Sequence, residues 1–146
     1  MQKVIDASAL LCYLNKEPGW EKMEELFTLA AEKEKSLQMS AVNWGEVLYI
    51  IRREVVDYNE AEAVERLIDT LPIEVVPVDR DLAREAASLK ASHKLAYADC
   101  FAAALAKKKK AELVTGEAKR SPDDHLGDKE FKAVESAGIK INWITS

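Results

Sequence analysis

The sequence predicts an α/β fold, with one domain in which a mainly parallel sheet lies between two layers of helices. Short runs rich in β-branched residues alternate with longer stretches whose apolar residues recur at helical spacing. That alternation is typical of parallel sheets with helices on both faces. The 146 residues show no second composition regime and no linker, so we expect a single three-layer domain over residues 1–146.

The first half of the chain contains two of the expected strands. A β-branched run ends at Asp6, and the Pro18-Gly19 pair separates two helical stretches. Ser40 is suited to cap the helix after the second strand, because its hydroxyl can accept a hydrogen bond from the first turn. The expected elements are a strand over residues 3–5, helices over 8–14 and 19–34, a strand over 37–39, and helices over 41–55 and 59–71.

The second half repeats the pattern. Pro72 ends a helix before a β-branched run, and Asp79 is suited to cap the helix that follows it. Alanine dominates the next helix, and an apolar strand then stops at Thr115-Gly116. The expected elements are a strand over residues 73–76, helices over 79–93 and 95–109, a strand over 113–115, a helix near 128–136 and a strand over 139–143.

Composition excludes several classes of protein. No apolar run approaches the roughly 20 residues that span a bilayer, and the N-terminal apolar stretch contains Asp6 and lacks a signal-peptide cleavage pattern. We therefore expect a cytoplasmic protein without a membrane partner.

Cys12 and Cys100 are too isolated to form a disulfide framework or a zinc site. The formal net charge of -5 argues against non-specific coating of nucleic acid, and the lysines at 107–110 form either a local binding patch or a solvated helix end.

Three acidic residues are expected at one edge of the sheet. Asp6 ends the first strand, Glu46 lies early in the helix after the second strand, and Asp99 opens the alanine-rich helix. Sites of open parallel sheets form at the carboxyl ends of the strands. Carboxylates that meet there raise one another's pKa unless a cation lies between them. An all-oxygen donor set without Cys or His favours Mg²⁺ or Mn²⁺, and such a site suits phosphodiester hydrolysis.

Each acid also has an ordinary interpretation. Asp6 and Asp99 fit the N-cap positions of helices, where Asp is favoured for local hydrogen bonding alone. Glu46 is harder to explain in this way, because an acid in so apolar a helix needs a partner. Both interpretations are open for each residue alone, and the set of three favours the metal site.

The chain resembles the PIN-domain ribonucleases, and among them the VapC-type toxins of toxin–antitoxin pairs. The resemblance lies in the segments VIDASALLCYLNKEPGW, SAVNWGEVLYIIRRE, LAYADCFAAALAKKKKAELVTG and GDKEFKAVESAGIKINWI. It implies that Asp6, Glu46 and Asp99 bind the metal, with Ser8 and Thr115 in supporting positions. It also implies Mg²⁺- or Mn²⁺-dependent cleavage of RNA, a five-stranded sheet of order 3-2-1-4-5, homodimers and a cognate antitoxin.

The fourth acid of that family has two candidates here. Proteins similar to this one continue from Thr-Gly directly into Asp, whereas this chain has Thr115-Gly116, then residues 117–127, then Asp128. Either Glu117 takes the fourth position at the strand end, or residues 117–127 form an inserted surface loop that returns Asp128 to the site. Glu117 has the expected chain position with one extra methylene, and Asp128 has the expected residue type.

Two other functions remain open. One is a metal-dependent phosphoesterase that acts on DNA with the same acids. The other is a non-enzymatic PIN-like interaction module with a degenerate site, in which substitution of Asp6 would leave the function unchanged. A phosphotransfer protein with an aspartyl nucleophile is disfavoured, because Asp6-Ala7-Ser8 lacks the second Asp of a D-x-D motif.

Overall fold

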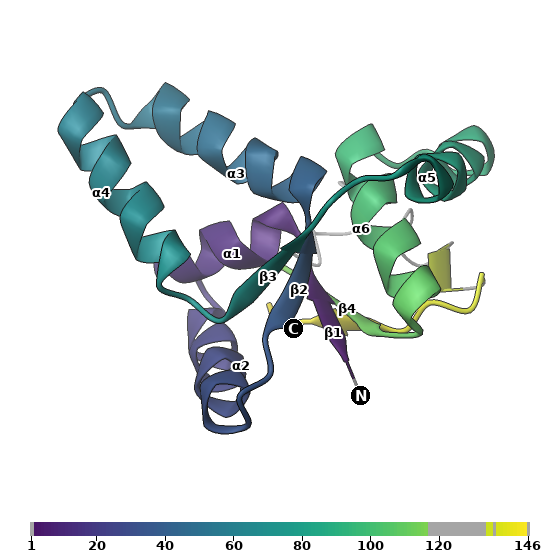
Figure 1. Cartoon of the computed structure of the whole chain (residues 1–146), viewed down its shortest axis with the longest axis horizontal. Coiled ribbons are helices and arrows are strands. Elements are labelled where there is room, and N and C mark those ends of the chain that lie inside the picture. The colour runs from purple at the N-terminus through teal and green to yellow at the C-terminus, as the bar shows by residue number, and fades with distance from the viewer. Residues whose placement is uncertain (1, 117–133, 136, 146) are drawn as a thin grey trace.

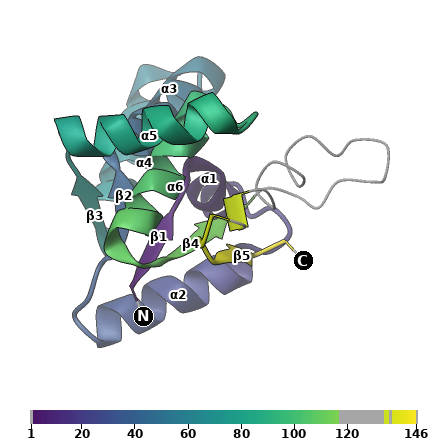
Figure 2. The same ribbon diagram turned by 90° about the vertical axis from the view of Figure 1, so that its right-hand side faces the viewer.

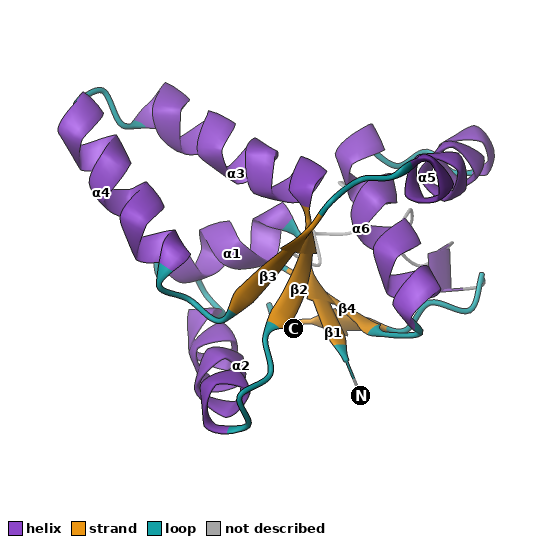
Figure 3. Cartoon of the chain, viewed as in Figure 1, coloured by secondary structure: helices purple, strands orange, loops and turns teal. Residues whose placement is uncertain are grey.

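Five parallel strands form one sheet in the order β3-β2-β1-β4-β5 (Figure 3). The computed structural model describes residues 2–116, 134–135 and 137–145. The strands, in sheet order, are β3 (Ile73–Val76), β2 (Leu37–Ser40), β1 (Lys3–Ile5), β4 (Glu112–Thr115) and β5 (Ile141–Trp143). The predicted sheet order and strand direction are confirmed.

The first strand of the chain lies at the centre of the sheet. Val4 of β1 is in register with Gln38 of β2 on one side and with Leu113 of β4 on the other. Because all neighbours are parallel, the carboxyl ends of β1, β2 and β4 lie side by side at one edge. Asp6, which directly follows β1, therefore lies between the segments that leave β2 and β4.

Helices cover both faces of the sheet (Figures 1 and 2). The helices of the described residues are α1 (Ala7–Leu14), α2 (Trp20–Glu32), α3 (Ala41–Glu54), α4 (Tyr58–Asp69), α5 (Arg80–Ser92) and α6 (Tyr97–Lys109). One buried cluster joins α5 and α6 to Val4, and a second joins α1, α2, α3 and α4 to Ile5. Successive residues of a strand point to opposite faces, so β1 supplies both cores. The three-layer prediction is confirmed.

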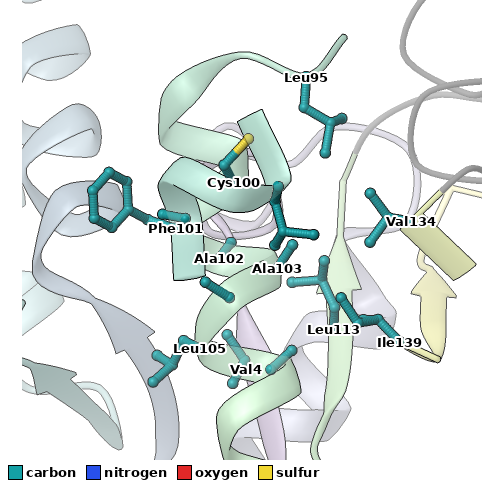
Figure 4. Close-up of a cluster of buried hydrophobic side chains, with 14 of the residues drawn as sticks. Val4, Leu95, Cys100, Phe101, Ala102, Ala103, Leu105, Leu113, Val134 and Ile139 are labelled. Atoms are coloured by element: carbon teal, nitrogen blue, oxygen red, sulfur yellow. The ribbon is translucent and has the colours of Figure 1, made fainter. Parts of the chain in front are cut away.

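Small side chains bring α6 close to the sheet. Ala102, Ala103 and Ala106 have no exposed surface, and neither do the strand residues Val4 and Leu113 of the same cluster. Figure 4 shows side chains of α6 packed toward those of β1 and β4. An alanine-rich face allows the helix backbone to approach the strands, which places the first turn of α6 next to the carboxyl edge of the sheet.

The predicted element boundaries agree with the structure to within two residues at each end that it describes. The largest differences are at helix ends and at the last strand. Leu95, for example, was expected to open α6, but the helix begins at Tyr97, and its N-cap Ala96 has a non-helical backbone conformation. The insert at 117–127 and most of the helix expected near 128–136 lie outside the described residues. No helix in the described part of the chain is long and apolar enough to cross a membrane.

Candidate functional site

Among the described residues, Asp6 is the most deeply buried acid at the carboxyl edge of the sheet, with 1% of its surface exposed. Its Oδ1 accepts hydrogen bonds from the backbone N–H of Ala9 at 2.9 Å and from the Ser8 hydroxyl at 2.7 Å. Its Oδ2 accepts from the Thr115 hydroxyl at 2.6 Å. Asp6 therefore caps α1, as the ordinary interpretation expects, and in addition binds a hydroxyl from the end of β4.

Ser8 and Thr115 connect α1 to the end of β4. Their hydroxyl oxygens lie 3.1 Å apart, and Ser8 Oγ also accepts from the backbone N–H of Gly116 at 2.9 Å. A Cβ on Gly116 would lie 2.4 Å from the Ser8 carbonyl oxygen, which is too close for any other residue without a backbone shift. We call Asp6, Ser8, Thr115 and Gly116 the Asp6 cluster. Glycine is thus required at position 116 by close packing at the end of the strand.

Burial raises the pKa of Asp6 above its ordinary value, and the hydrogen bonds from nearby hydroxyls and amides only partly offset this effect. A charged carboxylate so far from water is costly unless donors or a cation compensate it. The hydroxyl and amide donors supply part of the compensation. The carboxyl of Asp6 therefore holds its proton more tightly in the folded protein than in water.

Glu46 lies in α3, six residues after the end of β2. The helix begins at Ala41, where the Ser40 hydroxyl accepts from the backbone N–H of Val42 at 3.2 Å. Glu46 is half-buried. One turn earlier on the same helix face, Asn43 is wholly buried, and its Nδ2 donates to the Ala98 carbonyl oxygen of α6 at 3.0 Å.

Asp99 lies in the first turn of α6 and is half-buried. The N-cap position belongs to Ala96, which makes no side-chain capping bond, and Asp99 is the third residue of the helix. The interpretation of Asp99 as a plain N-cap is therefore wrong. An acid in the first turn still interacts favourably with the helix dipole. Asp99 also follows Ala98 directly, so the bond from Asn43 holds the Glu46 helix against the Asp99 turn.

The structure brings three of the predicted site residues into direct contact. Asp6, Ser8 and Thr115 are in direct contact, and α3 and α6, which carry Glu46 and Asp99, pack against each other. Among the described residues, no group of three or more His, Cys, Asp or Glu side chains is arranged to hold a metal ion. Glu117 and Asp128 lie outside the described residues, so metal binding by these acids stays a prediction.

The donor set itself fits a hard divalent cation. The edge offers carboxylate, hydroxyl and amide oxygens, and Asn43 Oδ1 is a buried oxygen without a hydrogen-bond donor. Mg²⁺ and Mn²⁺ prefer such oxygen ligands. Cys12 and Cys100 are buried in the apolar cores, where burial raises the pKa of both thiols. The chemistry of the edge therefore favours a hard cation over zinc.

The lysine run at 107–110 lies at the other end of α6 from Asp99. Asp99 and Lys107 are eight residues apart on one helix, which is a rise of about 12 Å. Lys107 pairs with Glu85 at 2.6 Å and Lys108 with Asp79 at 3.6 Å, both on or next to α5. The run forms a solvated helix end joined to α5, as the ordinary interpretation expects.

Two residues of this edge were not singled out from the sequence as site residues. Asn43 had a usable signal, because a polar residue one turn before Glu46 shares its helix face in an otherwise apolar segment. Gly116 had only its place in the Thr-Gly pair. Its close approach to Ser8 depends on the pairing of strands that are distant in the sequence, which no local pattern shows.

An α/β domain with a buried acid at the central switch of a parallel sheet is a common setting for a ligand or metal site. A family model for the PIN domain matches residues 3–119, and the chain belongs to that family. A comparison with curated proteins gave no match.

Three solved structures have closely similar folds. VapBC2 from Rickettsia felis, bound to a DNA fragment from its promoter, is 14% identical with a TM-score of 0.73, covering 97% of this chain and 98% of that one. DNA-bound VapBC from Salmonella typhimurium is 19% identical with a TM-score of 0.70. The match covers 99% of this chain and 98% of that one. VapC20 from Mycobacterium tuberculosis is a toxin that cleaves the sarcin–ricin loop. It is 17% identical with a TM-score of 0.62, and the match covers 94% of this chain and 96% of that one. At these identities the likeness shows the fold.

Proposed function

We propose that this protein is a metal-dependent endoribonuclease, the toxin of a toxin–antitoxin pair. The observation that carries the proposal is the Asp6 cluster in a chain that belongs to the PIN-domain family. The cluster holds a buried carboxylate at the central strand end, where a cation would relieve the cost of its charge.

The residues that would hold Mg²⁺ or Mn²⁺ are Asp6, Glu46 and Asp99, together with either Glu117 or Asp128. The bound ion would supply an activated water and stabilise the negative charge that develops on the phosphate. Ser8 and Thr115 would orient the Asp6 carboxylate, because their hydroxyls bond to separate oxygens of it. The backbone N–H of Ala9 fixes the same carboxylate from the helix side.

RNA as the substrate and an antitoxin as the partner are supported by the structural neighbours. VapC20 is a toxin that cleaves the sarcin–ricin loop, and another structure with a similar fold is a toxin–antitoxin complex from Klebsiella pneumoniae. We propose the same class of substrate and partner for this chain, and a homodimer as its assembly. The likeness covers 97% and 99% of this chain and 98% of each VapBC chain.

The decisive experiment is cleavage of a panel of structured RNAs by the purified chain, with Mn²⁺ and with chelator. We expect metal-dependent cutting that is lost in Asp6→Asn and kept in Asp81→Asn. Asp81 is an exposed carboxylate paired with Arg84 on α5, so it controls for loss of one negative charge. Glu117→Gln and Asp128→Asn in the same assay would identify the fourth acid.

Other outcomes would favour other functions. Cutting that persists in Asp6→Asn would indicate a contaminating nuclease. A folded, antitoxin-free protein that cuts single-stranded or flapped DNA instead of RNA would indicate the DNA phosphoesterase. Absence of cutting on both substrates would favour the non-enzymatic module with a degenerate site.

A further inference from the structure

Asn43 contains a buried oxygen that accepts no hydrogen bond from any group in the described part of the chain. The residue has no exposed surface, and its Oδ1 accepts no hydrogen bond. Among the described residues, only one other buried side-chain oxygen lacks a partner, Gln38 Oε1. An unsatisfied buried amide oxygen costs about 1–3 kcal/mol, so a native protein that keeps one has a reason for it.

The orientation of the Asn43 amide is fixed by its other end. Nδ2 donates to the Ala98 carbonyl oxygen at 3.0 Å. Rotating the amide by half a turn would place Oδ1 against that carbonyl, and two acceptors would then face each other. The free position is therefore an acceptor, and what completes it must be a donor or a cation.

The surroundings of Asn43 are already acidic. Glu46 follows it by one helical turn on the same face of α3, and Asp99 directly follows its bonding partner Ala98. An amide oxygen without a donor, placed between two carboxylate-bearing turns, increases the negative potential there. A divalent cation at this edge would be attracted by the partial charge of that oxygen as well as by the carboxylates.

We propose that Asn43 Oδ1 belongs to the cation site, as a buried uncharged oxygen whose negative partial charge favours a divalent ion held by the neighbouring carboxylates, and that Asn43 Nδ2 positions the Asp99 turn for the same ion. Asn43 is thus a positioning residue, because its amide belongs to α3 and bonds to the backbone of α6. This inference rests on the proposed function, since it requires that the carboxylates at this edge bind a metal.

The test is Mn²⁺ binding to the purified protein, measured by titration calorimetry without RNA. Asn43→Ala is expected to weaken Mn²⁺ binding about 10- to 100-fold, as is typical for residues that support metal ligands. Asn43→Asp keeps an oxygen at the free position and adds a charge, so it is expected to bind Mn²⁺ more tightly than the wild type. Both variants lose the donor to Ala98, so both are expected to melt at a lower temperature than the wild type.

Gln38→Ala is the matched control, because it also removes a buried amide with one unpartnered oxygen, here in β2. It should leave Mn²⁺ affinity unchanged.

The inference is overturned if Asn43→Ala binds Mn²⁺ as the wild type does, or if Asn43→Asp binds no more tightly than the wild type. The comparison of Asn43→Asp with the wild type tests the inference even where Asn43→Ala does not fold. A wild type that binds no Mn²⁺ overturns the proposed function along with the inference, whereas a binding wild type with an unaffected Asn43→Ala overturns the inference alone.

Discussion

The Thr115 hydroxyl donates to Asp6 Oδ2 at 2.6 Å and joins the ends of two strands that are 109 residues apart in the chain. Both side chains are buried. A hydrogen bond to a charged group in such surroundings is among the stronger ones in a protein. It fixes the direction of a carboxylate that the proposed mechanism uses.

Thr115→Val removes this hydroxyl while nearly keeping the shape of the side chain. We expect the free energy of unfolding to fall by about 1.5–3 kcal/mol at neutral pH, because a buried carboxylate loses a donor. Mn²⁺ affinity should fall as well, since the carboxylate is less well oriented. Chemical denaturation and calorimetry would measure the two effects. Thr115→Ser keeps a hydroxyl and is the control; equal losses in both variants would contradict the role of the bond.

The stability of the protein without metal should depend on pH through Asp6. Burial raises the pKa of Asp6 above its ordinary value of 3.8, so the folded state binds the proton more tightly than the unfolded state. The free energy of unfolding therefore falls as the pH rises from the ordinary value through the raised pKa, and it stays reduced above that window. The side chain of Asp6→Asn does not titrate. The free energy of unfolding of this variant should therefore rise relative to that of the wild type as the pH rises through the window. Urea melts in chelator over this pH range would test it, and a difference that does not change with pH would refute it.

Glu112 should have the opposite pH dependence. Burial alone would raise its pKa, but hydrogen bonds from Asn142 at 2.7 Å and Lys3 at 3.1 Å outweigh burial and hold the pKa below its ordinary value. Its stabilising contribution is therefore present above the ordinary pKa of 4.5 and is lost as the pH falls through the lowered pKa. Glu112→Gln should cost about 1–3 kcal/mol at neutral pH and much less in acid. Asp81→Asn, in an exposed pair with Arg84, should change stability by less than about 1 kcal/mol; a similar cost in both variants would contradict the prediction.

Two glycines should respond to alanine with opposite signs. A Cβ on Gly116 would lie 2.4 Å from the Ser8 carbonyl oxygen, so Gly116→Ala must displace the end of β4 and should destabilise by about 1–3 kcal/mol. Gly45 lies inside α3 with no atom within 4 Å of an added Cβ, so Gly45→Ala should stabilise by about 0.5–1 kcal/mol. Thermal melts of the two variants would compare them. A Gly116→Ala protein as stable as the wild type would show that the Thr-Gly turn is not tightly packed against α1.

Most of the fold could be predicted from the sequence because its signals are local. The β-branched runs, the capping residues Ser40 and Asp79, and the helical spacing in α2 each act over a few residues, and the structure keeps them. The resemblance to the PIN-domain family supplied the order of the strands, which local patterns do not contain. Helix ends were less predictable, since Leu95 is buried like a helix residue but precedes the helix.

The site was predictable in residue type but not in contacts. Asp6, Ser8 and Thr115 were expected at one edge, and the structure places them in contact. The bond from Asn43 to Ala98 could not be anticipated, because it depends on how α3 crosses α6. The same holds for the close approach of Gly116 to Ser8, which follows from strand pairing across most of the chain.

The central position of β1 has a consequence for how the protein is made. A ribosome delivers β1 first, but one of its two neighbours in the sheet, β4, begins only at Glu112. Contacts between such distant segments form late, because the intervening chain must first be ordered. The hydroxyl of Thr115 therefore reaches Asp6 only after the whole segment from β1 to β4 has left the ribosomal tunnel. Until then the Asp6 carboxyl has one donor fewer, and the Asp6 cluster is incomplete.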